Sequence, residues 1–133
     1  MARPTQVTAT AVWGADRYTT PPGMENKDAW TVTLRYAGRR LTVPFYMGYG
    51  HSGRAPTASD VLTCLLSDAA MFENTADIYE FAREAGCASA REARFVYAGV
   101  KRNTDKLQRF LGDEYEAALW NGEAWAAAHV SEG

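Results

Sequence analysis

A GxGxxG pattern occupies residues 48–53, between an expected strand and an expected helix. Glycines in this pattern let backbone amides approach a phosphate at the N-terminus of a helix, and His51 and Arg54 could add charge or hydrogen bonds. Pro56 delays the next helix, however, and no second strand of a βαβ unit follows. We favour the interpretation that these glycines form turns in a flexible loop, and phosphate or nucleotide binding is the alternative.

His51 is also the loop histidine that lies near serines, Ser52 and Ser59. A nucleophile and its base need an orienting third group and an oxyanion site, and the sequence shows neither. The carboxylates of residues 75–85 fall on one face of an expected helix, as a solvated stripe does. We therefore expect no enzyme activity and no catalytic residues.

Metal and redox chemistry have little support in the cysteines and histidines. Cys64 and Cys87 form neither a metal-ligand spacing nor a CxxC pair, and the two histidines are His51 and His129. Free cysteine is usually a buried packing residue, so we expect both thiols to be reduced and structural. The sequence predicts no metal and no cofactor.

The segment from Ser89 to Leu111 has the pattern of one two-faced helix with 3.6-residue periodicity. Its apolar side, which we expect to pack on a sheet, holds Ala93, Val96, Tyr97, Val100, Leu107, Phe110 and Leu111. Its opposite side is basic and holds Arg91, Arg94, Lys101, Arg102, Lys106 and Arg109. Phe95 is an aromatic residue on this charged side.

The basic side is either neutralised within the fold or binds a partner, which could be a protein or a nucleic acid. The charge comes in blocks: residues 1–56 and 89–111 each carry a net +4, and residues 57–88 and 112–133 each carry −5. Acidic helices could lie beside the basic one and neutralise it, or the basic side could meet an anionic partner.

Arginine and aromatic residues dominate the centres of protein interfaces, and Phe95 with the arginines fits such a centre. Nucleic-acid binding through the same helix is the alternative. Against it, the chain is acidic overall, with a pI of about 5.7, and we expect no preceding helix and glycine-containing turn in helix-turn-helix order. A third possibility for Phe95 is that it packs under the helix before it.

A second candidate surface is the loop from Tyr46 to Arg54, which contains Tyr49 and His51. We expect this loop and the basic side with Phe95 to bind the partner. No apolar run approaches the roughly 20 residues of a membrane span. No apolar stretch follows the first residues either, so we expect a cytosolic protein that does not bind membranes.

Alternating apolar residues predict the strands. Residues 6–13 form a first strand, residues 30–36 a second, and residues 41–45 a third, with a tight turn over residues 37–40. Pro44 lacks a backbone N–H, so the third strand needs an unpaired edge or a bulge there.

The first helix begins after Thr57, whose pattern with Asp60 resembles a capping box, and ends near Asp68 or Ala70. A second helix covers about residues 75–85 and ends at Gly86. Gly99 marks either close packing or a break in the basic helix, and residues 113–120 form a short fourth helix.

Strands followed by helices favour an α+β fold, a small antiparallel sheet of about three strands packed against three to four helices. The 133 residues fit a single domain. Within it we expect a flexible loop over residues 14–28 and a tail over residues 123–133 that is loosely docked.

The segment WTVTLRYAGRRLTVPFYMG at residues 30–48 resembles a group of small uncharacterised proteins encoded by tailed phages and prophages. The likeness covers roughly residues 28–112 and continues through a set of shorter matches. These are His51, Pro56-Thr57, Asp60-Val61-Leu62, Cys64-Leu65, Ser67-Asp68-Ala69 and the stretch from Leu107 to Gly112.

The resemblance implies a phage accessory protein that acts in the host cytoplasm. Such proteins often bind host machinery, and the implied partner is a host protein or protein complex, with anti-defence activity such as anti-CRISPR inhibition as the leading example. The resemblance implies no catalytic residues in this chain.

Overall fold

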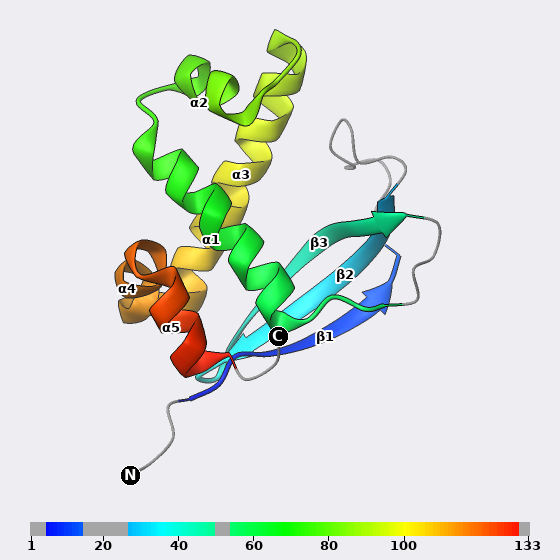
Figure 1. Cartoon of the computed structure of the whole chain (residues 1–133), viewed down its shortest axis with the longest axis vertical. Helices are drawn as coiled ribbons and strands as arrows, with labels where there is room; N and C mark the ends of the chain where they lie inside the picture. Colours follow the sequence, from blue (N-terminus) through cyan, green and yellow to red (C-terminus); the bar gives the residue numbers. More distant parts are fainter. Residues whose placement is uncertain (1–4, 15–26, 50–53, 131–133) are drawn as a thin grey trace.

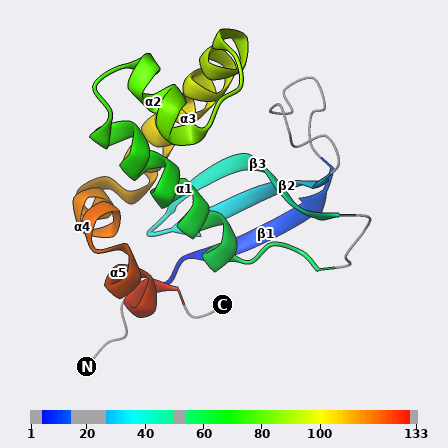
Figure 2. The same ribbon diagram turned by 45° about the horizontal axis from the view of Figure 1, so that its top comes forward.

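A three-stranded antiparallel sheet forms one layer of the molecule, and helices cover one of its faces (Figures 1 and 2). The computed structural model describes residues 5–14, 27–49 and 54–130. Strands β1 (Thr8–Trp13), β2 (Lys27–Tyr36) and β3 (Arg39–Tyr49) lie in the order β1-β2-β3. The predicted α+β fold with a small antiparallel sheet is confirmed.

The hairpin between β2 and β3 has a two-residue turn. Tyr36 lies opposite Arg39, and the turn residues Ala37 and Gly38 have φ angles of 50° and 78°. Two consecutive positive φ angles are typical of the turn whose twist matches paired strands. The turn is shorter than predicted, because Arg39 and Arg40 already belong to β3. Pro44 lies on an edge strand, as its missing N–H requires.

The strand boundaries differ from the prediction at three other places. β1 begins at Thr8, and β2 begins at Lys27, so Lys27 and Asp28 are strand residues and not part of a loop over 14–28. Residues 15–26 of that loop lie outside the described residues. β3 continues to Tyr49, so residues 46–49 are strand residues and not part of the predicted loop from Tyr46 to Arg54.

The helices in the described ranges are α1 (Ala58–Asn74), α2 (Ile78–Ala85), α3 (Ala90–Leu111), α4 (Tyr115–Trp120) and α5 (Gly122–His129), with a short 3-10 helix, η2 (Gly112–Glu114), before α4. Thr57 and Asp60 form the predicted capping box. α1 is longer than predicted, because the ring of Phe72 lies 5.4 Å from that of Tyr97 in α3 and extends the apolar contact. α3 passes through Gly99 without a break.

The connection between α2 and α3 corrects one expectation. α2 ends at Gly86 in a left-handed conformation, and α3 is capped by Ser89. The chain therefore has two successive helices joined by a glycine-containing turn of residues 86–89, in helix-turn-helix order. The prediction that this order is absent was wrong.

The main core lies between the sheet and the helices on its covered face. The sheet contributes Val32, Leu34, Leu41 and Val43, α1 contributes Val61, Leu62 and Leu65, and the last turns of α3 contribute Leu107, Phe110 and Leu111. Burial of these apolar side chains is the main stabilising term of the fold.

Only the C-terminal half of α3 packs toward the sheet. The N-terminal half extends beyond it, beside α2 (Figure 1). There Phe81 of α2 is buried and meets Tyr97 edge to face, with ring centroids 5.4 Å apart. The expectation that the whole apolar side of this helix lies on the sheet is therefore corrected.

The alanine-rich C-terminal stretch, predicted to be loosely docked, forms α5 and is anchored. Trp125 is buried, its ring stacks on His129 at 4.1 Å, and its Nε1–H donates to a Glu114 carboxylate oxygen at 3.1 Å. The Val7 N–H donates to the His129 carbonyl at 2.8 Å. This bond joins the two ends of the described chain.

Candidate binding surface

The basic side of α3 is exposed along the helix. The Ser89 hydroxyl accepts from the Glu92 N–H and fixes where the helix begins, so the periodicity sets which side chains point outward. All six predicted basic residues, Arg91, Arg94, Lys101, Arg102, Lys106 and Arg109, are exposed. From Arg91 to Arg109 the row is about 27 Å long at 1.5 Å per residue.

Few of these cations are neutralised by neighbours. In residues 5–14, 27–49 and 54–130, Lys101 pairs with Asp105 of its own helix at 3.3 Å, and the other five make no ion pair. The same ranges contain no ion pair between α3 and an acidic helix. The described contacts therefore do not support the interpretation that acidic helices neutralise this side.

Two arginines of the hairpin extend this surface, and the sequence analysis did not single them out. Arg39 and Arg40 of β3 lie beside Lys106 and Arg109 of α3, around a depression of about 500 Å³. We call this depression the basic groove; its lining also includes Leu41, Thr42 and Phe110. The six α3 cations together with Arg39 and Arg40 are the basic surface.

Arg39 has a fixed position in the groove. Its Nε–H donates to the Phe110 carbonyl at 2.7 Å, and Nη2 donates to the Leu111 carbonyl at 3.5 Å. These carbonyls belong to the last turn of α3, where the helix cannot satisfy them itself and where its dipole favours a cation. In the described residues, the guanidinium therefore bridges the hairpin and α3 and makes no ion pair with a carboxylate.

Phe95 is 38% exposed, so part of its side chain is accessible to a partner. It lies in the first half of α3, and Arg102 separates it from the basic groove along the helix. Tyr79 of α2 is a second aromatic side chain with a large exposed fraction, 77%.

The predicted loop from Tyr46 to Arg54 does not join the basic surface. Tyr46 lies in β3, about 20 Å beyond Arg40 at 3.4 Å per strand residue. Its hydroxyl is buried and has no hydrogen-bond partner in the described structure. Tyr49 ends β3 and its side chain is not described, and His51 and Gly50–Gly53 of the glycine pattern lie outside the described residues.

Arg54 makes a local contact instead. Its Nη2 donates to Asp60 at 3.0 Å, while Asp60 also accepts from the Thr57 N–H at 2.9 Å. Burial alone would raise the pKa of Asp60, but the hydrogen bonds from Thr57 and Arg54 outweigh it and hold the pKa below its usual range. Arg54 thus stabilises the beginning of α1.

The residues that could support metal or thiol chemistry do not gather. The described ranges contain no group of three or more His, Cys, Asp or Glu side chains placed to hold a metal ion. Cys64 and Cys87 are free thiols; Cys64 is exposed and Cys87 is half-buried, so the expectation that both are buried packing residues is corrected. Partial desolvation still raises the pKa of both thiols, that of Cys64 to about 11. A raised pKa keeps a thiol protonated at neutral pH and so unreactive.

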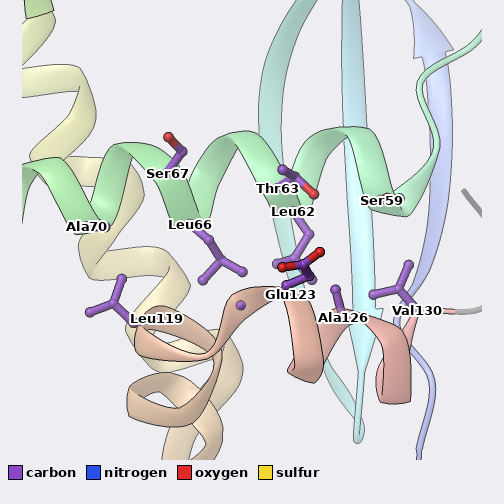
Figure 3. Close-up of a pocket in the computed structure, with 11 residues that line it drawn as sticks. Ser59, Leu62, Thr63, Leu66, Ser67, Ala70, Leu119, Glu123, Ala126 and Val130 are labelled. Carbon is purple, nitrogen blue, oxygen red and sulfur yellow. The ribbon is translucent and has the colours of Figure 1, made fainter.

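A second depression, of about 380 Å³, lies between α1 and α5. Figure 3 shows Leu62 and Leu66 of α1 facing Leu119, Ala126 and Val130 across it, with the Glu123 carboxylate near the middle. Ligand sites usually combine apolar walls with several converging polar groups, and here the charged group is a single carboxylate. The basic surface is therefore the stronger candidate.

Comparison with protein-family models, with curated proteins and with solved structures finds no match. None of the helices in the described ranges combines the length and apolar composition of a membrane span.

Proposed function

We propose that this protein is a non-enzymatic binding module that docks its basic surface against an acidic surface of a partner protein. The observation that carries the proposal is the row of five exposed cations on α3 that make no ion pair within the described part of the chain, joined by Arg39 and Arg40 at the groove. A rigid helix holds these charges at fixed spacing, so binding a matching row of carboxylates costs little ordering of the backbone.

The residue types support a protein partner. Four of the six α3 cations are arginines, which form bidentate pairs with carboxylates and are enriched at the centres of interfaces together with aromatic residues. Phe95 supplies such an aromatic residue on the same side. In the context that the phage resemblance implies, the partner would be a host protein in the cytoplasm, such as a component of a defence system.

Nucleic-acid binding is the second candidate, and one observation favours it. α2, the turn at residues 86–89 and α3 follow in helix-turn-helix order, and the first turns of α3 expose Arg91, Arg94 and Phe95. Against it, the helix that would cross the phosphate backbone carries the exposed carboxylates of Asp77 and Glu84, and the chain has a net charge of −2. Both features repel a polyanion.

The proposal is tested by affinity capture from a host lysate with three versions of the tagged chain. Arg109→Glu reverses a charge of the basic surface, and Arg83→Glu is the matched control, because both arginines are exposed and lie in the last turn of a helix. We expect one stoichiometric protein that the wild type and Arg83→Glu retain and Arg109→Glu loses. Equal recovery by both variants would contradict the proposed surface.

A filter-binding titration with duplex DNA over a range of salt concentrations tests the second candidate, nucleic-acid binding. Retention at low salt that falls steeply as salt rises would favour nucleic-acid binding, because phosphate contacts release counterions. Absence of retention at low salt removes that candidate.

A further inference from the structure

The first half of β3 has a free backbone edge beside the basic groove. β3 is the last strand of the sheet, so one side of it pairs with β2, and none of the strands in the described residues lies along its other side. In an antiparallel pair, residues alternate between those that exchange hydrogen bonds with the partner strand and those whose N–H and C=O point the other way.

The register shows which residues of β3 point outward. Tyr36 and Arg39 close the two-residue turn as a hydrogen-bonded pair, so Leu41 and Val43 also bond to β2. The hydrogen bond from the Gly14 N–H to the Ala29 carbonyl supports this alternation. It shows that the backbone N–H and C=O groups of odd-numbered β2 residues point toward β1, so those of even-numbered residues point toward β3. The N–H and C=O groups of Arg40 and Thr42 therefore point to the free edge.

We propose that an extended, acidic segment of a partner protein adds to β3 at Arg40–Thr42 as a fourth strand. This inference rests on the proposed function and names the form in which the partner binds. Strand addition gives affinity through backbone hydrogen bonds, and the flanking side chains give specificity. Arg40 and Thr42 line the basic groove, so a strand paired with them lies next to Lys106 and Arg109.

The surrounding charges specify the composition of that segment. Side chains of an added strand alternate between the two faces of the sheet. On the helix-covered face they meet Lys106 and Arg109 of α3, and on the opposite face they meet Arg40. Carboxylates at the alternate positions that lie on the helix-covered face therefore match Lys106 and Arg109.

Two features of the edge favour a short peptide over a nucleic acid. The edge offers both donors and acceptors at Arg40 and Thr42, whereas a phosphodiester can only accept hydrogen bonds. Pro44 is the next outward-pointing residue and has no N–H, so the ladder ends there. The site is therefore short, and strand pairing cannot extend along the whole of β3.

The test uses a fluorescently labelled peptide that alternates glutamate and valine, followed by anisotropy. A matched peptide carries N-methyl groups on alternate backbone nitrogens, which keep its charge and remove its donors. We expect the first peptide to bind and the second to bind about tenfold more weakly, the effect of losing one or two hydrogen bonds. On binding, the amides of Arg40 and Thr42 should gain protection from hydrogen exchange.

Two variants separate the contribution of the backbone edge to peptide binding from the contribution of the cations. Thr42→Pro removes an outward N–H and no cation, and Thr42→Val is its control, because it also loses the hydroxyl that contacts the Thr33 hydroxyl at 3.0 Å. We expect Thr42→Pro to weaken binding about tenfold and Thr42→Val to leave it unchanged. If Thr42→Pro fails to fold, the N-methylated peptide tests the same bond.

The outcomes distinguish this inference from the proposed function. If both peptides bind equally and Arg109→Glu still weakens them, the basic surface binds acidic protein without strand addition, and the inference is overturned while the proposed function stands. If neither peptide binds and duplex DNA does, both are overturned.

Discussion

The Nε–H of Arg39 donates a 2.7 Å hydrogen bond to the carbonyl of Phe110, which joins the start of β3 to the last turn of α3. The side chain of Phe110 is buried in the main core, so this bond holds a surface arginine to a fixed part of the fold. The contact places Arg40, the neighbour of Arg39, next to the cations of α3. The shape of the basic groove therefore depends on it.

Arg39→Ala should destabilise the protein by about 1 to 2 kcal/mol, since it removes a charge-assisted hydrogen bond to a helix carbonyl. The measurement is urea unfolding followed by circular dichroism. Arg40→Ala is the control, because Arg40 is exposed and has no hydrogen bond or ion pair in the described residues. We expect it to change stability by less than about 0.5 kcal/mol. Equal effects of the two changes would contradict the structural role of Arg39.

Gly99→Ala should stabilise the protein by about 0.5 to 1 kcal/mol, because glycine in a helix interior costs that much against alanine. An added Cβ would meet only the Arg102 guanidinium at 3.8 Å, an ordinary contact distance. Thermal unfolding tests this. Gly86→Ala is the opposite control, since its φ of 71° strains an alanine and should lower the melting temperature. A destabilised Gly99→Ala would mean that α3 needs a glycine there.

Local patterns predicted most of the fold. The alternation of residues 30–36 and the capping residues Thr57 and Ser89 act within a few positions of the chain, so their signals are complete in the sequence. The exposed side of α3 was predictable for the same reason, because helical periodicity fixes it once the apolar side is known.

The groove was not predictable in this way. Arg39 and Phe110 are 71 positions apart, and nothing local to either residue indicates that they meet. The docking of α5 has the same cause: it depends on Val7 and Tyr36, whose ring lies 5.6 Å from that of Trp125. Contacts between distant segments set these features, and propensity and periodicity do not encode them.

Asp60 should give the protein a stability component that is lost in acid. Its folded pKa is lowered, so the ionised form is favoured in the folded state, and the contribution is present above the unfolded pKa of about 3.9. It disappears as pH falls through the lower folded pKa. Asp60→Asn should therefore cost about 1 kcal/mol at pH 7 and almost nothing in strong acid.

The measurement is urea unfolding of both proteins over a range of pH. Asp113→Asn serves as the control, since Asp113 is exposed and has no hydrogen bond or ion pair in the described residues. A difference between wild type and Asp60→Asn that stays constant down to the lowest pH would show that the charge of Asp60 contributes nothing.

Phe81→Ala should release α2 without unfolding the sheet. Phe81 is 1% exposed and lies outside the main core cluster, in contact with Tyr97. Removing a buried phenylalanine costs about 3 to 5 kcal/mol, which exceeds what an eight-residue helix gains by itself. Hydrogen exchange should rise across α2 and the first turns of α3 and stay low in β2. Leu107→Ala, in the main core, should instead raise exchange in both regions.

Phe95→Ala should weaken partner binding and leave the fold intact. Phe95 is 38% exposed and projects from the basic side of α3, where an aromatic side chain can be buried by a docking surface. Truncating an aromatic interface centre costs about 2 kcal/mol or more of binding, close to a thirtyfold loss of affinity. Tyr79→Ala is a matched control, because Tyr79 is also an exposed aromatic residue on a helix but lies on α2. Titration calorimetry with the captured partner would compare the two variants, and thermal unfolding would confirm unchanged stability. If Phe95→Ala bound as tightly as wild type while Arg109→Glu did not, the partner would contact only the groove end of α3.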